Sequence, residues 1–370
     1  MLKKFPHLFI VLLIEGGALM AVELMGAKLV APFYGNSLYV WTAVLTMTVL
    51  GLTLGYYTGG RLAKKGASET TLFVILGISA VLVVALPLTA SIAIALTKGM
   101  GLIAGICVTC ILLLLPPMLS FGIVGPMVVS LMSSQLETVG KTAGTVYFTS
   151  TVGGIVVTFL LGLYLIPVAG LRWCATVTGL ALAALPIVYI AKRAFGGSTV
   201  AGIGDAGSQK RRSPAPAGTS ARRGRLSLRK GEGEGEGFLV TRTIYLFAVL
   251  EGATVMAVEL MSARMVAPYF GSSLYVWATV IGCTLLALAI GYFLGGVIAD
   301  KYRGPDALLW LLLIASVFLL LMHVSASLLT MAFENIAPGA AVILVSVALI
   351  LPPLMFLGMV PTFLIRRVSA

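Results

Sequence analysis

The chain has 370 residues, of which 59% are hydrophobic and only 10% are charged. This composition leaves too little polar surface to cover a water-soluble globule, so it excludes a soluble protein and indicates one that lies in a bilayer. The net charge of +12 could suggest nucleic acid, but the placement of the basic residues indicates membrane orientation instead.

Apolar runs long enough to cross a bilayer recur along the whole chain. The first run is long, carries carboxylates and returns later as an internal element, so it is not a cleavable signal peptide. We therefore predict an all-α, polytopic transmembrane bundle. A spanning helix needs roughly 20 apolar residues, and about ten runs qualify: 8–32, 38–60, 70–96, 102–132, 143–167, 172–192, 243–268, 274–297, 307–331 and 337–365.

The chain repeats itself. Residues 15–60 recur as residues 251–296 without a gap, with about 26 of 46 positions identical at a shift of about 236. Both copies begin on the same side of the membrane, so the repeats are parallel, and the second is shorter. The predicted organisation is a six-helix repeat, a disordered basic linker in the cytoplasm and a four-helix repeat, at 1–194, 195–240 and 241–370.

Basic residues set the expected orientation. If the N-terminus is cytoplasmic and every run spans once, most of them fall on the cytoplasmic side. The exceptions on or near the other side are Lys28, Lys98, Arg172 and Arg264. We expect a multi-pass protein of the cell inner membrane whose linker either lies near anionic headgroups or serves as a solvated spacer.

Four glutamates lie within apolar runs, in two pairs that the repeat relates. Glu15 and Glu23 are in the first run and return as Glu251 and Glu259. Ionised carboxylates at membrane depth are costly, so they normally face a bundle interior or a wet cavity and mark functional positions. Eight residues separate the members of each pair by about 12 Å along the helix. All four are candidates for binding a substrate or protons around a shared cavity.

Each of these helices ends with a cation, Lys28 or Arg264, five residues after its second glutamate. The two side chains point about 140° apart, so they do not pair within the helix. We count both cations as candidate site residues that meet another helix or reach the outer headgroups. A structural role for the glutamates stays open, as bridges between helices or as partners of backbone at a kink.

The second helix of each copy begins with Tyr and Trp, in 37–41 and 273–277. Such residues are typical of an interfacial aromatic belt, with an aromatic cage as the alternative. Further along, Gly51, Gly55 and Gly59 recur every four residues. This stripe of small residues predicts the close approach of another helix.

The fourth helix of each copy carries consecutive prolines near midspan, Pro116-Pro117 and Pro352-Pro353. Proline removes a backbone donor, so each pair predicts a helix break, tolerated only where protein or a wet cavity satisfies the freed carbonyls. Transporters bind ions at broken helices of this kind. Kinked packing alone would look the same in sequence.

An ordered set of motifs carries a family resemblance. It runs from EL(M)xA(K/R)xVAP(F/Y)xGxSLYVW through GYxxGG and LPPxxxxG to residues 144–154 and Leu165-Ile166-Pro167. Together these motifs resemble the membrane domain of fused spermidine-synthase-like integral membrane proteins, which is similar to the major facilitator superfamily. The resemblance covers nearly all of the chain except the linker. It implies a small cationic solute such as a polyamine.

The chain departs from that family in one respect. Nothing in it matches the soluble aminopropyltransferase-like domain of the fused proteins, so we expect no catalytic centre. The facilitator comparison rests on a cytoplasmic loop pattern with Asp300, Lys301 and Arg303. In that comparison the second half stops after its fourth helix. Either another chain completes it, or the protein is a reduced derivative that does not transport.

Three functions remain open. The chain is a transporter whose carboxylates bind a cationic small molecule or protons, a scaffold for a partner membrane chain, or an anchor that recruits a soluble aminopropyltransferase-like enzyme. Apart from the lipid bilayer, these are the expected partners, with no nucleic acid. We expect no cofactor and no metal site, since the histidines have no ligand cluster and the linker's GxGxxG has no strand before it.

Overall fold

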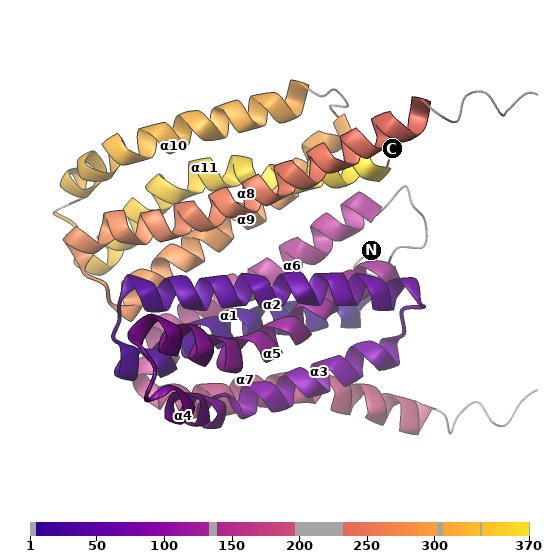
Figure 1. Cartoon of the computed structure of the whole chain (residues 1–370), viewed down its shortest axis with the longest axis horizontal. Helices are drawn as coiled ribbons and strands as arrows, with labels where there is room; N and C mark the ends of the chain where they lie inside the picture. Colours follow the sequence, from indigo (N-terminus) through magenta and orange to yellow (C-terminus); the bar gives the residue numbers. More distant parts are fainter. Residues whose placement is uncertain (1–4, 133–138, 197–231, 302–305, 334, 370) are drawn as a thin grey trace, which may run out of the picture.

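The computed structural model describes the chain except for residues 1–4, 133–138, 197–231, 302–305, 334 and 370. All regular structure in the described part is helical (Figure 1). Its elements are α1 (Pro6–Tyr34), α2 (Leu38–Lys64), α3 (Glu69–Val84), α4 (Leu86–Thr97), α5 (Leu102–Met132), α6 (Val139–Phe159), the π-helix η2 (Leu160–Leu165), α7 (Ile166–Gly196), α8 (Glu232–Phe270), α9 (Leu274–Lys301), α10 (Asp306–Ala332) and α11 (Pro338–Ser369).

These helices account for the predicted number of membrane spans. In the described part, eight helical stretches are long and apolar enough to cross a membrane, and α3 with α4, bent by 59°, forms a ninth. The stretch Thr142–Ala194 contains a break at Gly170, whose φ of 77° is not helical. Counting its two sides separately gives ten segments, so the predicted polytopic bundle is confirmed. The protein is a multi-pass membrane protein.

The two repeats lie side by side and run in the same direction (Figure 1). The beginning of α1, the end of α7, the beginning of α8 and the end of α11 lie at one end of the bundle, which we call the inner end. At the other end, the outer end, α1 and α8 each stop at a glycine, Gly35 or Gly271, with φ of 82° and 79°. A side chain rarely adopts this backbone conformation, so both copies make the same turn.

Inside each repeat the second and fourth helices pack most closely. α2 lies along α5, and α9 lies along α11. A Cβ on Gly55 would overlap the backbone of α5 at Leu119, and one on Gly291 would overlap α11 at Met355. The close approach predicted from the glycine spacing is therefore confirmed, and the second copy reproduces it.

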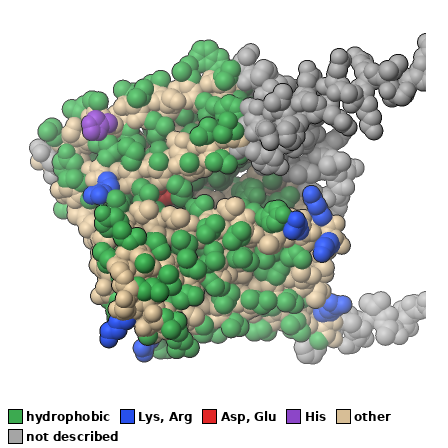
Figure 2. All heavy atoms as spheres, viewed as in Figure 1, with side chains coloured by type: hydrophobic (Ala, Val, Ile, Leu, Met, Phe, Trp, Pro, Cys, Tyr) green, Lys and Arg blue, Asp and Glu red, His purple; other side chains and the backbone are tan. Residues whose placement is uncertain are grey.

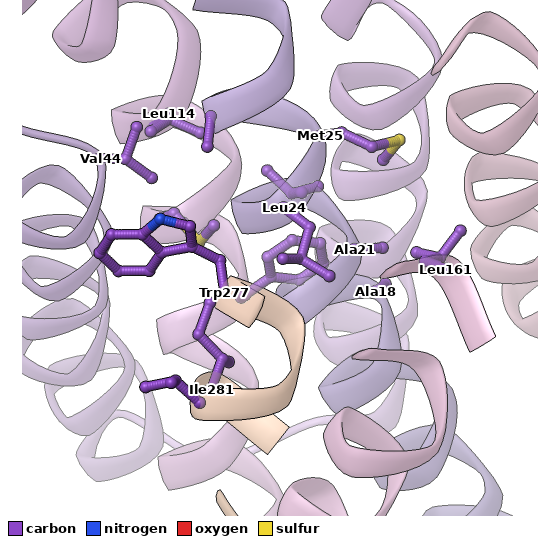
Figure 3. Close-up of a cluster of buried hydrophobic side chains, with 14 of the residues drawn as sticks. Ala18, Ala21, Leu24, Met25, Val44, Leu114, Leu161, Trp277 and Ile281 are labelled. Atoms are coloured by element: carbon purple, nitrogen blue, oxygen red, sulfur yellow. The ribbon is translucent and has the colours of Figure 1, made fainter. Parts of the chain in front are cut away.

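One hydrophobic core joins the two repeats. α6 packs against both α1 and α9, and side chains of α9 insert among helices of the first repeat (Figure 3). Trp41 and Trp277 stack with ring centroids 4.0 Å apart and are 0% and 5% exposed. The predicted interfacial belt is therefore wrong for the tryptophans, because each ring finds its apolar partner in the other repeat. Tyr39, 63% exposed, remains at the surface.

The proline pairs do not break their helices. α5 continues through Pro116 and Pro117, and α11 continues through Pro352 and Pro353. The predicted helix breaks are therefore corrected. Proline's fixed φ of about −65° is itself helical, so the pair removes hydrogen bonds without ending a helix whose flanks are packed. α2 supplies that packing in the first repeat, where a Cβ on Gly51 would touch Met118.

The surface agrees with a bilayer environment. The side of the bundle in Figure 2 is largely hydrophobic, with Lys and Arg side chains near its two ends. α8 begins at Glu232, so its first turns occupy the end of the predicted linker, because a helix extends cheaply once it has formed. Residues 197–231 lie outside the described part, and the cytoplasmic linker remains a prediction.

Candidate functional site

The four glutamates lie on α1 and α8, the first helix of each repeat. Glu15, Glu23 and Glu259 are each 4% exposed, and Glu251 is half-buried. α1 is enclosed by α2, α5, α6 and α7. In the described part the only ion pair joins His7 to Glu69, at 3.2 Å. Three of these carboxylates are therefore buried in the bundle and Glu251 is partly enclosed, and no cationic side chain of the described part is bonded to any of the four.

Helix geometry places these carboxylates in two layers. Glu23 lies 11 residues before the end of α1 and Thr48 lies ten residues after the start of α2, about 15–17 Å from the outer end in each case. By the same count, Glu15 and Tyr56 lie about 27–29 Å from that end. The repeat gives each position an equivalent, so we call the two levels the outer layer and the inner layer.

The inner layer joins tyrosines to two carboxylates. Tyr147 of α6 lies between Tyr56 of α2 and Tyr292 of α9, with ring centroids 6.5 and 6.4 Å apart. Glu15 is close enough to Tyr56 to interact electrostatically, and Glu251 stands in the same relation to Tyr292. The five side chains come from five helices and both repeats. They form one cluster of aromatic faces flanked by acidic groups.

Glu15 is the best anchored carboxylate of this cluster. Ser150 Oγ on α6 donates a hydrogen bond to Glu15 Oε2 at 3.2 Å. Close packing brings these elements together, since a Cβ on Gly16 would overlap the backbone carbonyl of Ser150. Gly153 makes the reciprocal approach to Leu13. Small residues on α1 and α6 therefore place a polar side chain beside a buried carboxylate.

A cavity of about 720 Å³ adjoins the inner layer. Tyr292 belongs both to the tyrosine cluster and to the wall of this cavity. The remaining lining comes from α1, α6 and α9 and is mostly apolar: Phe9, Ile10, Leu13, Gly144, Thr145, Phe148, Thr149, Phe293, Gly296 and Val297. The cavity is large enough for a small molecule and reaches the cluster at one tyrosine.

The outer layer is more enclosed. Glu23 and Glu259 lie close enough to interact electrostatically. Thr48 faces Glu23, but among the described residues its buried hydroxyl has no partner within hydrogen-bond distance. The equivalent threonine, Thr284, is also buried without a described partner at that distance. Two acidic and two hydroxyl side chains therefore occupy equivalent positions in the two repeats.

The outer end of the bundle is closed above this layer. The stacked Trp41 and Trp277 rings lie there, and Trp41 Nε1 donates to Asn36 Oδ1 at 3.0 Å. Asn36 Nδ2 in turn donates to the backbone carbonyl of Ser272. These contacts join the turn between α1 and α2 to the turn between α8 and α9.

Other predicted site residues lie apart from both layers. Lys28 is half-buried and Arg264 is exposed near the outer end of α8, and neither forms an ion pair in the described structure. The side chains of Asp300 and Lys301, and all of Arg303, lie outside the described residues. The cytoplasmic loop pattern therefore stays a prediction.

Sequence reasoning missed the tyrosines and the threonines. Tyr56 and Tyr292 occupy the same place in the repeated GYxxGG motif, and Thr48 and Thr284 are also equivalent. Identity between the copies was thus a usable signal. Tyr147 has no equivalent among the motifs of the second copy, and only its packing between the two repeats reveals it.

Comparison with known proteins gives a limited result. No protein-family model matches the chain. No curated protein matches it either. Among solved structures, it is similar to the xylose transporter XylE from E. coli in a partially occluded inward-open conformation, at 15% identity and a TM-score of 0.45, over 98% of this chain and 87% of the other.

Proposed function

We propose that the protein binds a small organic cation at the inner layer and carries it across the membrane. The observation that carries this proposal is the cluster of Tyr56, Tyr147 and Tyr292 flanked by Glu15 and Glu251, beside a cavity of about 720 Å³. The resemblance of the chain's sequence motifs to the spermidine-synthase-like membrane domain supports an amine as the ligand, with a polyamine as the first candidate.

The chemistry of the cluster suits an amine. A carboxylate supplies the counter-charge and a hydrogen-bond acceptor, and a tyrosine face attracts a cation by about 0.5–2 kcal/mol, the higher value when the site is desolvated. Glu15 keeps a fixed position because Ser150 bonds to it. The apolar cavity wall then contacts the hydrocarbon portion of the ligand, which gains from leaving water.

The two ends of the bundle differ in a way that supports transport. The outer end is closed by the tryptophan stack and Asn36. Tyr56, on the inner layer, is 42% exposed. Transport by parallel repeats requires that one end opens as the other closes. Under this proposal the site is reached from the inner end in this state, and the orientation prediction assigns this end to the cytoplasm.

Binding of spermidine, putrescine and a singly charged alkylamine to the purified chain in detergent, by calorimetry, tests the proposal. We expect saturable binding that weakens roughly tenfold or more in Glu15→Gln and in Glu251→Gln, since a tenfold loss corresponds to about 1.4 kcal/mol. Tyr147→Leu should weaken binding roughly 3- to 30-fold through loss of the aromatic face. Uptake into proteoliposomes should fall in the same order.

Tyr39→Leu is the matched control, because Tyr39 is exposed and lies at the other end of the bundle. It should bind as the unchanged protein does. Absence of saturable binding by the unchanged chain, or equal affinity in Glu15→Gln and the control, would overturn the proposal.

A scaffold function is the second candidate, and the surroundings of α8 favour it. In the most apolar stretch of each helix, 28% of α8 but 78% of α1 is buried. A partner membrane chain on the uncovered face of α8 would protect it as α6 protects α1. Cysteine cross-linking from Val249 in native membranes tests this function, and reaction with lipid-soluble reagents alone would contradict it. Recruitment of a soluble enzyme depends on the linker and remains a prediction.

A further inference from the structure

The outer layer has the electrostatics of an ion site. Glu23 and Glu259 come from equivalent positions, are buried, and interact with each other. No cationic side chain pairs with either of them in the part of the chain that the structure describes. Two ionised carboxylates repel each other strongly where the dielectric constant is low, and each is costly to bury alone. A positive charge close to both would therefore stabilise them in their ionised form.

Two threonine hydroxyls provide the second, independent observation. Thr48 and Thr284 are 3% and 2% exposed, and in the described part neither hydroxyl has a partner within hydrogen-bond distance. A helical threonine commonly donates to the carbonyl four residues earlier. Thr53 on α2 and Thr279 on α9 do so, at 2.8 and 2.9 Å. An unpaired buried hydroxyl costs stability, and Thr48 turns its oxygen toward Glu23 instead.

We propose that Glu23, Glu259, Thr48 and Thr284 form a binding site for one dehydrated alkali-metal cation, with Na⁺ as its first candidate. The two carboxylates and two hydroxyls offer oxygen ligands alone, which hard cations prefer. In the described part, no group of three or more His, Cys, Asp or Glu side chains could hold a metal ion. The two hydroxyls supply further oxygen ligands beside the two carboxylates.

The enclosure of this layer sets the size of the ion. None of the four side chains lines the cavity of about 720 Å³, so an organic amine has its space at the inner layer. Mg²⁺ usually keeps several of its water molecules, which need room that buried side chains do not provide. A monovalent metal ion sheds its water at lower cost, so the enclosed layer favours such an ion.

The position of the site gives the ion a role. α1 carries both Glu15 and Glu23, about 12 Å apart along one helix, and α8 repeats this arrangement. An ion that holds Glu23 and Glu259 together fixes the two helices that also carry the inner carboxylates. Coupling of the ion to the solute rests on the proposed function. Binding of the ion itself does not.

Equilibrium dialysis of radioactive sodium against the purified chain in detergent tests the site, without any amine and with choline chloride to keep ionic strength constant. We expect one saturable class of binding. Glu23→Gln and Glu259→Gln should each weaken it roughly 10- to 100-fold, as expected for a ligand that carries charge. Thr48→Val and Thr284→Val should weaken it roughly 3- to 10-fold and, because valine has the same shape, should leave the fold intact.

Thr53→Val and Tyr39→Leu are the matched controls. Both residues lie on α2 with exposed side chains. Both variants should bind sodium normally. No sodium binding above the choline background, equal weakening by Thr53→Val and Thr48→Val, or replacement of sodium by Ca²⁺ at equal concentration would overturn the proposal. Sodium binding without amine binding would keep this site and reject the proposed function, and the reverse result would do the opposite.

Discussion

α1 and α8 share most of their sequence from Glu15 and Glu251 onward, yet their surroundings differ. α6 and α7 pack on α1, whereas the main neighbours of α8 in the described structure are α9, α10 and α11. A Cβ on Gly16 would overlap the carbonyl of Ser150, but one on the equivalent Gly252 would meet no described atom within 4 Å. The repeated sequence therefore determines the helix and its polar positions, and the neighbouring helices determine which of them are buried.

Unlike α1 and α8, the second helices of the two repeats, α2 and α9, have equivalent partners. α2 with α5 and α9 with α11 form equivalent pairs, and Gly55 and Gly291 approach equivalent backbone. Both partners of each pair lie within the repeat, so the same contacts form twice. Differences between the copies arise where a helix needs a partner from outside the repeated segment.

The largest expected effect concerns the tryptophan stack between the two repeats. Trp41→Ala and Trp277→Ala should each lower the free energy of unfolding by about 3–5 kcal/mol, because each removes a buried ring from one stack. Denaturant unfolding in detergent measures this loss. The double variant should lose less than the sum, since the residues are in contact. Tyr39→Ala, at an exposed position, should change stability little, and additive losses would contradict the shared stack.

The comparison between α1 and α8 is sharpest at their equivalent glycines. Gly16→Ala should lower the free energy of unfolding by about 1–3 kcal/mol, because the new methyl group overlaps α6. Gly252→Ala should raise it by about 0.5–1 kcal/mol, because alanine favours the helix and the space is open. Thermal unfolding of the two variants in one detergent measures the difference. Equal effects would show that the two helices have equivalent surroundings.

The smallest effect concerns a hydrogen bond that only the first repeat makes. Tyr34 and Thr97 hydroxyls lie 2.7 Å apart, so Tyr34→Phe should lower the free energy of unfolding by about 1 kcal/mol. The equivalent residue is Phe270, and the equivalents of Thr97 and Thr109 are Phe333 and Val345. Phe270→Tyr should therefore gain nothing in the same unfolding measurement. A gain there would show that the hydroxyl acts without these partners.

Sequence patterns predicted the fold better than they predicted the contacts between side chains. Long apolar runs and the constant shift predicted the spans, the parallel repeats and the glycine contacts, since each depends on local hydrophobicity and spacing. The helix breaks predicted at the proline pairs were wrong, because a missing backbone donor does not reveal whether packing supports the helix around it. The tryptophans misled as well, since their amphipathic character suits an interface unless another ring covers them.

The candidate site was predictable only in part. Glu15, Glu23, Glu251 and Glu259 stand out in sequence because a carboxylate in an apolar run is costly. Their division into the inner layer, with its tyrosines, and the outer layer, with its threonines, was not visible in the sequence. It depends on Tyr147, which approaches two tyrosines from a different helix, and on the direction of the Thr48 side chain.

By itself, the sequence determined that this chain lies in a membrane, that it contains two parallel copies of one helical module, and that each copy brings two acidic groups to membrane depth. These features follow from hydrophobicity, length and repetition, which are properties of single segments. Only the tertiary structure decided that α6 covers α1 and that the two tryptophans meet. It also brought three tyrosines from different helices into one cluster. Such contacts join residues far apart in the chain, so they depend on how both surfaces pack.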